Sequence, residues 1–68
     1  MYARTLTKET HVHRFVITQQ PGAGWEVREE ADDTVVRRAY YEDWHRVERA
    51  QRAFAMTEQE LRGLGWVD

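Results

Sequence analysis

The 68-residue sequence predicts an α+β domain. It comprises a three-stranded antiparallel β-meander over about residues 11–18, 25–30 and 34–40, a main helix over about 42–55 and a short C-terminal helix over about 58–63. Two observations lead to this fold class. Between His11 and Tyr40 the residue types alternate as in half-buried strands, with two turn signals in between. After Tyr40 the apolar residues recur at helical spacing, so a helix can cover the sheet.

The chain is long enough for one domain only, which we place over residues 11–68. Residues 1–10 are polar and rich in Thr, and they are expected to form a flexible N-terminus or a short extra strand around 2–6.

The first two strands are predicted to form a hairpin. Phe15 and Ile17 share one face of the first strand, and Trp25 and Val27 share one face of the second. Residues 19–24 between them contain the only Pro and two of the four Gly. This composition indicates a hairpin tip, and a phosphate-binding loop is excluded because no helix follows it.

The third strand follows Asp32-Asp33, which indicates a turn because short acidic side chains bond to their own backbone. Its buried face stays ambiguous. Each of its two faces contains both Val and Arg, in the sets Val36, Arg38 and Tyr40, and Val35, Arg37 and Ala39.

The main helix is predicted to close over the apolar side of the sheet through Trp44, Val47 and Phe54. Residues 57–60 have the form of a capping box, which predicts the start of the short second helix. Gly63 suits the left-handed position at its end. The apolar tail is expected to place Trp66 over an open end of the core; the alternative is insertion into a partner's groove.

Composition excludes several classes of function. The chain has no Cys, so it has neither disulfides nor thiolate metal ligands, which fits a reducing cytoplasm. It has no apolar run of the ~20 residues that a membrane helix needs. Nine of its ten cationic residues are Arg, which favours a GC-rich bacterial genome. We expect a cytoplasmic bacterial protein.

No motif identifies a reaction, a cofactor or a small-molecule substrate. His11 and His13 on one strand face, with His45 as a third ligand, could begin a zinc or copper site, but solvent-facing imidazoles are the preferred interpretation. His45 also lies beside Glu42 and Asp43 without a nucleophile nearby, and Ser is absent. We therefore expect no enzymatic activity, no cofactor and no metal.

Charge changes sign in blocks along the chain, a pattern that favours internal pairing or self-association. Together with the many aromatic residues, it predicts a protein–protein interaction or self-association module, for example a homodimer. The residues predicted to take part are Trp25, Arg37, Arg38, Tyr40, Tyr41, Trp44 and Trp66.

The alternative is an accessory protein that binds nucleic acid, since Arg pairs well with phosphate. The residues predicted for that role are Arg28, Arg37, Arg38, Arg46, Arg49 and Arg52. The competing interpretation is a solubilising surface whose arginines pair with Glu42, Glu48 and the acidic second strand. The net charge of −2 favours pairing, because dedicated binders carry a basic excess.

In its order of elements, the stretch 11–55 resembles small uncharacterised bacterial domains, and also the DNA-binding domains of plant transcription factors and phage integrases that combine three strands with a helix. The second resemblance implies a sheet that enters the DNA major groove with Trp25, Arg28, Arg37 and Arg38. The sequence departs from it on the second strand, where phosphate would be repelled by Glu26, Glu29 and Glu30.

Overall fold

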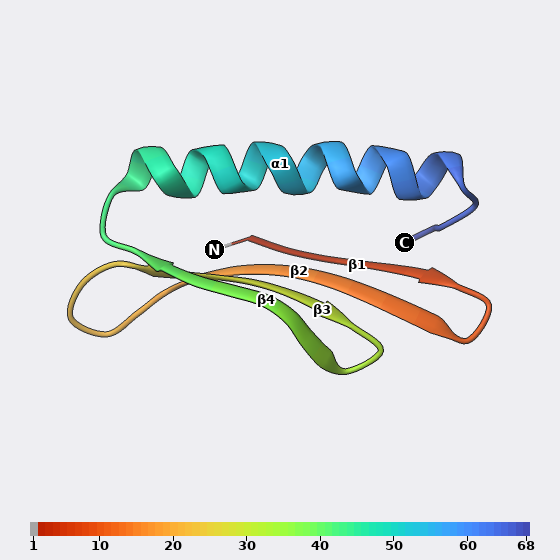
Figure 1. The fold of residues 1–68 in the computed structure, drawn as a ribbon, viewed down its shortest axis with the longest axis horizontal. Helices are drawn as coiled ribbons and strands as arrows, with labels where there is room; N and C mark the ends of the chain where they lie inside the picture. Colours follow the sequence, from red (N-terminus) through yellow and green to blue (C-terminus); the bar gives the residue numbers. More distant parts are fainter. Residues whose placement is uncertain (1) are drawn as a thin grey trace.

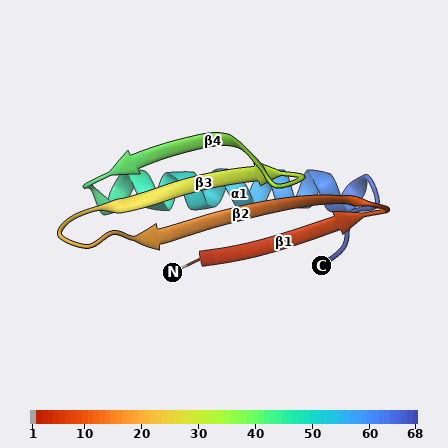
Figure 2. The same cartoon turned by 90° about the horizontal axis from the view of Figure 1, so that it is seen from below.

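The computed structural model describes residues 2–68, and its centre is an antiparallel sheet in the order β1-β2-β3-β4. The strands are β1 (Tyr2–Lys8), β2 (His11–Gln19), β3 (Trp25–Ala31) and β4 (Thr34–Tyr41). A helix, α1 (Trp44–Gly63), runs along one face of the sheet (Figure 1). Seen from below, the other face carries no helix of the described chain (Figure 2). The predicted α+β class is confirmed, and the number of strands is corrected from three to four.

The fourth strand is β1. Of the two structures expected for the N-terminal residues, the short extra strand is therefore the one observed, and the flexible N-terminus is wrong for residues 2–8. Leu6 anchors this strand, because it faces the helix and is fully buried. Thr5 and Thr7 are β-branched and favour extended backbone. The fourth strand also distinguishes this fold from the three-stranded DNA-binding domains that the sequence resembles.

The predicted hairpin is confirmed, with Ile17 paired to Val27. Its tip needs glycine at Gly24, whose φ is +90°. A Cβ atom at this position would lie 2.7 Å from the Tyr41 carbonyl oxygen. The tip of the hairpin therefore packs against the end of β4.

The predicted turn at Asp32 and Asp33 is also confirmed, and both residues have positive φ, at 50° and 67°. The Asp32 carboxylate accepts a hydrogen bond from the Val12 amide at 2.9 Å and lies 3.0 Å from the His11 Nδ1 atom. The amide and then the imidazole lower the pKa of Asp32. This turn is thereby fastened to the start of β2.

A β-bulge decides which face of β4 is buried. The register between β3 and β4 shifts between Glu29 and Glu30, which pair with Arg37 and Val35. Val36 is the extra residue, and it is 56% exposed. Past the bulge, Arg37, Ala39 and Tyr41 lie on the helix side of the sheet, because they pair with the inward positions of β3.

Residues 44–63 form one continuous helix, so the predicted division into helices at about 42–55 and 58–63 is wrong. Asp43 caps its start and accepts a hydrogen bond from the His45 amide at 3.0 Å. The buried positions Val47, Phe54 and Glu58 lie on one stripe that continues past residue 57. No helix in residues 2–68 is apolar enough to cross a membrane.

The capping-box interpretation fails because the stripe continues through it. Thr57 lies inside α1, and its hydroxyl donates to the Ala53 carbonyl at 3.1 Å. Leu61, one turn beyond Glu58, packs against the core. Packing against the sheet therefore outweighs the local signal for a new helix start.

The C-terminus of α1 closes in a Schellman motif, in which Gly65 and not Gly63 takes the left-handed conformation. The Gly65 amide donates to the Arg62 carbonyl at 3.1 Å, and the Trp66 amide donates to the Leu61 carbonyl at 3.0 Å. The motif turns the tail back toward the sheet, where Trp66 packs against the core as predicted.

The core lies between the sheet and α1 and contains Leu6, Phe15, Ile17, Val27, Val47 and Phe54. The Phe15 and Phe54 rings meet at 4.9 Å between centroids. Val47 and Phe54 are buried as predicted, but Trp44 is 48% exposed. The first turn of α1 therefore overhangs the end of the core.

Tyr2 and Glu58 fasten β1 to α1. The Tyr2 hydroxyl donates to the Glu58 carboxylate, which is only 7% exposed. Arg4 lies beside the same carboxylate, at 3.9 Å. Burial, and then the hydrogen bond to Glu58, raise the pKa of Tyr2 to about 12.

We expect Phe54→Ala to lower the free energy of unfolding by about 3–5 kcal/mol, because it removes a buried ring and leaves a cavity. A domain of this size has only about that much stability, so the variant should be largely unfolded. Urea denaturation followed by far-UV circular dichroism measures this. Met56→Ala, at a position that is 67% exposed on the same helix, should cost less than about 0.5 kcal/mol. Equal losses for the two variants would contradict the described core.

We expect a phenolate transition near pH 12 that belongs to Tyr2. Because the folded-state pKa lies above the unfolded value, the contribution of this group to stability is present below about pH 10 and is lost between about pH 10 and 12. Ultraviolet titration of phenolate absorbance should show this late transition. Tyr2→Phe should abolish it, whereas Tyr40→Phe should keep it; the same transition in both variants would contradict the assignment.

Candidate interaction surface

The residues predicted for interaction do not form one surface. Trp25, Trp44 and Tyr41 lie on the helix side near the start of α1, while Arg38 and Tyr40 lie on the open face of the sheet. Trp66 lies at the opposite end of the helix from Trp44. The structure therefore separates aromatic residues that support the core from those available to a partner.

Trp25 and Trp44 close one end of the core. Their ring centroids are 5.3 Å apart, and the ring planes are inclined by 58°. Trp66 closes the other end, with its ring edge-on to His13 at 6.1 Å. Trp25 and Trp66 are only partly exposed, so their main role is packing, and Trp44 alone among the Trp residues presents a large exposed area.

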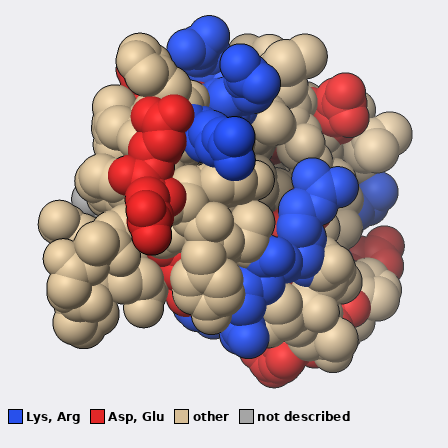
Figure 3. All heavy atoms as spheres, turned by 60° about the vertical axis from the view of Figure 1, so that its left-hand side comes forward, with Lys and Arg blue, Asp and Glu red and all other residues tan. Residues whose placement is uncertain are grey.

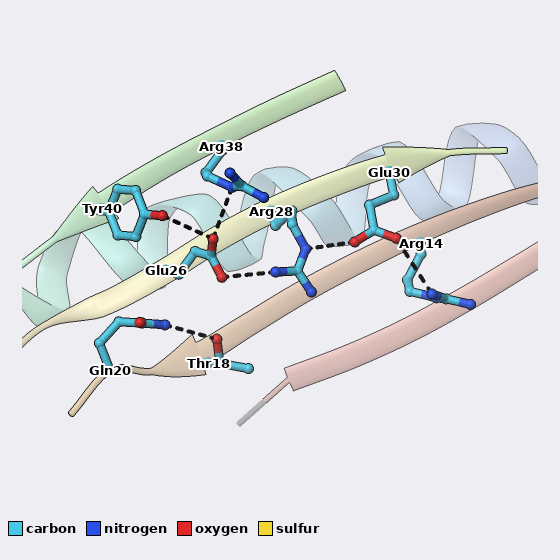
Figure 4. Close-up of polar contacts among 8 residues, drawn as sticks. All are labelled: Arg14, Thr18, Gln20, Glu26, Arg28, Glu30, Arg38 and Tyr40. Atoms are coloured by element: carbon cyan, nitrogen blue, oxygen red, sulfur yellow. Dashed lines mark hydrogen bonds and ion pairs between the residues drawn. The ribbon is translucent and has the colours of Figure 1, made fainter. Parts of the chain in front are cut away.

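The open face of the sheet carries a row of alternating charges, centred on Glu26 (Figure 4). This carboxylate is 8% exposed. It accepts hydrogen bonds from Arg28 at 2.9 Å and from the Tyr40 hydroxyl at 3.3 Å, and it forms an ion pair with Arg38 at 2.9 Å. Its charge is therefore matched by groups on β3 and β4.

The row continues through Glu30, which lies 2.6 Å from Arg28 and 3.5 Å from Arg14. Val16, the register partner of Arg28, is only 7% exposed although no helix covers this face. Long arginine stems can shield such a residue. Two of the arginines predicted for nucleic acid, Arg28 and Arg38, are thus engaged with acids of β3, as the pairing interpretation expected.

The other four arginines predicted to bind nucleic acid differ from Arg28 and Arg38 in their pairing. Within residues 2–68, no ion pair joins an acid to Arg37, Arg46, Arg49 or Arg52. All four are exposed. Figure 3 shows basic side chains gathered at the level of α1 and in a diagonal run at the level of the sheet. The predicted pairing of the helix arginines with Glu42 and Glu48 is therefore not observed.

Three of these arginines line one groove between α1 and β4, with a volume of about 400 Å³. We call it the arginine groove, and its lining consists of Arg37, Arg46 and Arg49 with Val27, Ala39, Tyr41, Ala50, Ala53 and Phe54. Among residues 2–68, no carboxylate lines it. It thus combines unpaired positive charge with an apolar floor.

A second groove, of about 700 Å³, lies on the other side of α1, toward β1. Its charged residues are mixed in sign: Arg4, Arg52 and Arg62 with Glu48 and Glu58. This side therefore has no clear preference for an anion. Arg52, predicted for nucleic acid together with Arg46 and Arg49, lines this groove and not the arginine groove, although it lies one turn from Arg49 on α1.

The two edges of the sheet also differ. The outer edge of β1 receives the C-terminal tail, as Thr7 and Val67 exchange backbone hydrogen bonds of 2.7 and 2.9 Å. No strand of the described chain lies beside the outer edge of β4. Val36 and Tyr40 on this strand are 56% and 62% exposed. The arginine groove and the free edge therefore lie side by side.

The histidines do not converge on a metal site. His11 contacts Asp32, and His13 lies 2.7 Å from Glu29 under partial cover. The expectation of a solvent-facing imidazole is therefore wrong for His13. In the part of the chain that the structure describes, no three metal-binding side chains come together.

Comparison of the chain with models of known protein families, with curated proteins and with solved structures gives no match. Function must therefore be argued from the side chains themselves. Sequence reasoning identified Arg37, Arg46 and Arg49 but placed them in one set with the paired arginines. The useful signal was their spacing: Arg46 and Arg49 lie one turn apart on a flank of α1.

Proposed function

We propose that this protein is a small non-enzymatic binding module that takes an extended segment of a protein partner as an added strand beside β4. The observation that supports this is the free edge of β4. The strand has eight residues and contains no Pro, Gly or Lys. Its outward backbone groups offer a ready template for another strand.

The difference between the two edges supports β4 over β1. At β1 the chain's own Val67 already takes the place of an added strand. A partner at that edge would have to displace this residue and the Schellman turn that positions it. At β4 a partner would displace no other segment of the described chain.

A foreign strand suits this edge better than a second copy. Arg37 and Arg38 occupy the middle of β4, where a two-fold axis would place copies of the strand against each other. Antiparallel pairing centred on either residue sets guanidinium groups directly opposite, and like charges in that position are destabilising.

The added-strand function predicts that peptides selected from a random twelve-residue phage library will bind along β4. In the complex, amide hydrogen exchange measured by NMR should slow at alternate residues of 34–41, because those amides become hydrogen-bonded. The amides of β1 serve as the control and should be unchanged. Selection of no peptide above background, or peptides that protect β1 instead, would contradict the function.

The second candidate, nucleic-acid binding, is favoured by one observation: Arg37, Arg46 and Arg49 lie together without acidic partners. It ranks below protein binding because the net charge is −2. It predicts that a fluorescent twenty-nucleotide oligothymidylate binds at about 50 mM salt and is released steeply as salt rises. The double variant Arg46→Gln/Arg49→Gln should weaken binding about tenfold and Arg52→Gln much less. No anisotropy change at about 50 mM salt would remove this candidate.

A further inference from the structure

We propose that the arginine groove selects the partner by binding acidic side chains of the added strand. This inference rests on the proposed strand addition at β4. The occupant is an extended segment in which Asp or Glu alternates with apolar residues. Its acidic side chains enter the groove, and its backbone continues the sheet.

The direction of the side chains follows from the register of β4. Arg37, Ala39 and Tyr41 lie on the helix side of the sheet and also line the groove. A strand added about 4.8 Å beyond β4 keeps the same alternation, so every second side chain points to the helix side. Those side chains enter the space between β4 and the flank of α1 that carries Arg46 and Arg49.

The spacing of charges also matches. Side chains that share a face of a strand repeat every ~6.7 Å. Arg46 and Arg49 are neighbours one turn apart on the helix, with Cβ atoms about 5–6 Å from each other. The flexible arginine stems can bridge this small difference. Two consecutive groove-facing carboxylates could therefore each reach a guanidinium, while Arg37 lies on β4 itself.

The lining of the groove favours an acid over other side chains. A basic side chain would meet three guanidinium groups and no carboxylate. A purely apolar side chain would cover the floor but remove water from unpaired charges, which is costly. A Glu side chain satisfies both parts, since its methylenes cover the floor around Ala39 and Ala50 and its carboxylate accepts charge-assisted hydrogen bonds.

A second copy of the chain does not supply such a strand. Among the four strands, only β3 carries acidic residues, and it is a central strand paired on both sides; two further acids, Asp32 and Asp33, form the turn after it. Both turn residues have positive φ, so they cannot lie extended along β4 without opening that hairpin. The acidic strand must therefore come from a different protein.

The test uses the full-length chain and two synthetic peptides, acetyl-Thr-Val-Glu-Val-Glu-Val-Glu-Val-Thr-amide and its counterpart with Gln at every Glu. Isothermal titration at about 50 mM salt gives their affinities, and NMR amide shifts locate the site. We expect the Glu peptide to bind along residues 34–41 and the Gln peptide to bind the same place about tenfold more weakly.

Protein variants assign the preference to the groove. Arg46→Gln/Arg49→Gln should bring the two peptides to within about twofold of each other. Arg52→Gln is the matched control, because it removes the same charge from a helix residue that lines the other groove, and it should keep the tenfold difference. Far-UV circular dichroism of each variant should match the unmodified protein, since all three positions are exposed.

The other possible outcomes show whether the proposal for the groove alone fails or whether the added-strand function fails with it. Equal binding of both peptides along β4 would overturn the selective groove and leave the added-strand function standing. No effect of either peptide on the amides of β4 would overturn both. Shifts confined to the groove on the β1 side, or binding of oligothymidylate alone to the arginine groove, would also overturn the assignment to an acidic strand.

Discussion

One helix cannot cover a four-stranded sheet, and the surface of this molecule follows from that limit. A helix with side chains is about 10–12 Å across, while four strands span about 14 Å between the outermost backbones, and their side chains extend further. The helix must lie over the middle of the sheet to bury Phe15 and Phe54 against each other, at 4.9 Å between ring centroids. Both flanks of α1 are then left open, and the two grooves, of about 700 and 400 Å³, are the result.

The two flanks differ in how their charges are paired and in whether another segment of the chain pairs with the edge strand beside them. On the β1 side, Tyr2 and Arg4 meet Glu58, and the C-terminal tail pairs with the edge strand. On the β4 side, the acids that could neutralise arginines are already taken: Glu26 and Glu30 face the opposite side of the sheet, and Glu29 contacts His13. A chain with a negative net charge thereby presents a local basic site, because its acids are used elsewhere.

The sequence predicted the sheet from 11 to 41 well because alternation, Gly24 and the two Asp residues of the turn are local signals that tertiary contacts reinforce. It left β1 undecided between a flexible N-terminus and a short extra strand, because polar Thr residues outnumber the buried Leu6 there, and it failed at Thr57, where a local capping pattern lies within a longer buried stripe. The candidate site was harder to predict from the sequence than the fold. Arg37 and Arg38 are adjacent in sequence, yet the bulge and the pleat send one toward the groove and the other to Glu26. Only the register separates a free guanidinium from a paired one.

A free edge strand is a hazard unless something prevents copies of the chain from pairing there. Here the arginines at the centre of β4 discourage pairing with an identical strand. One of them, Arg37, also lines the groove proposed to attract an acidic strand, so a feature that protects against self-pairing also discriminates among partners. This links specificity to solubility: neutralising Arg37 would weaken the attraction for acid and the protection against a second copy together. An edge of this kind can therefore stay open in the free protein and remain available for a partner of opposite charge.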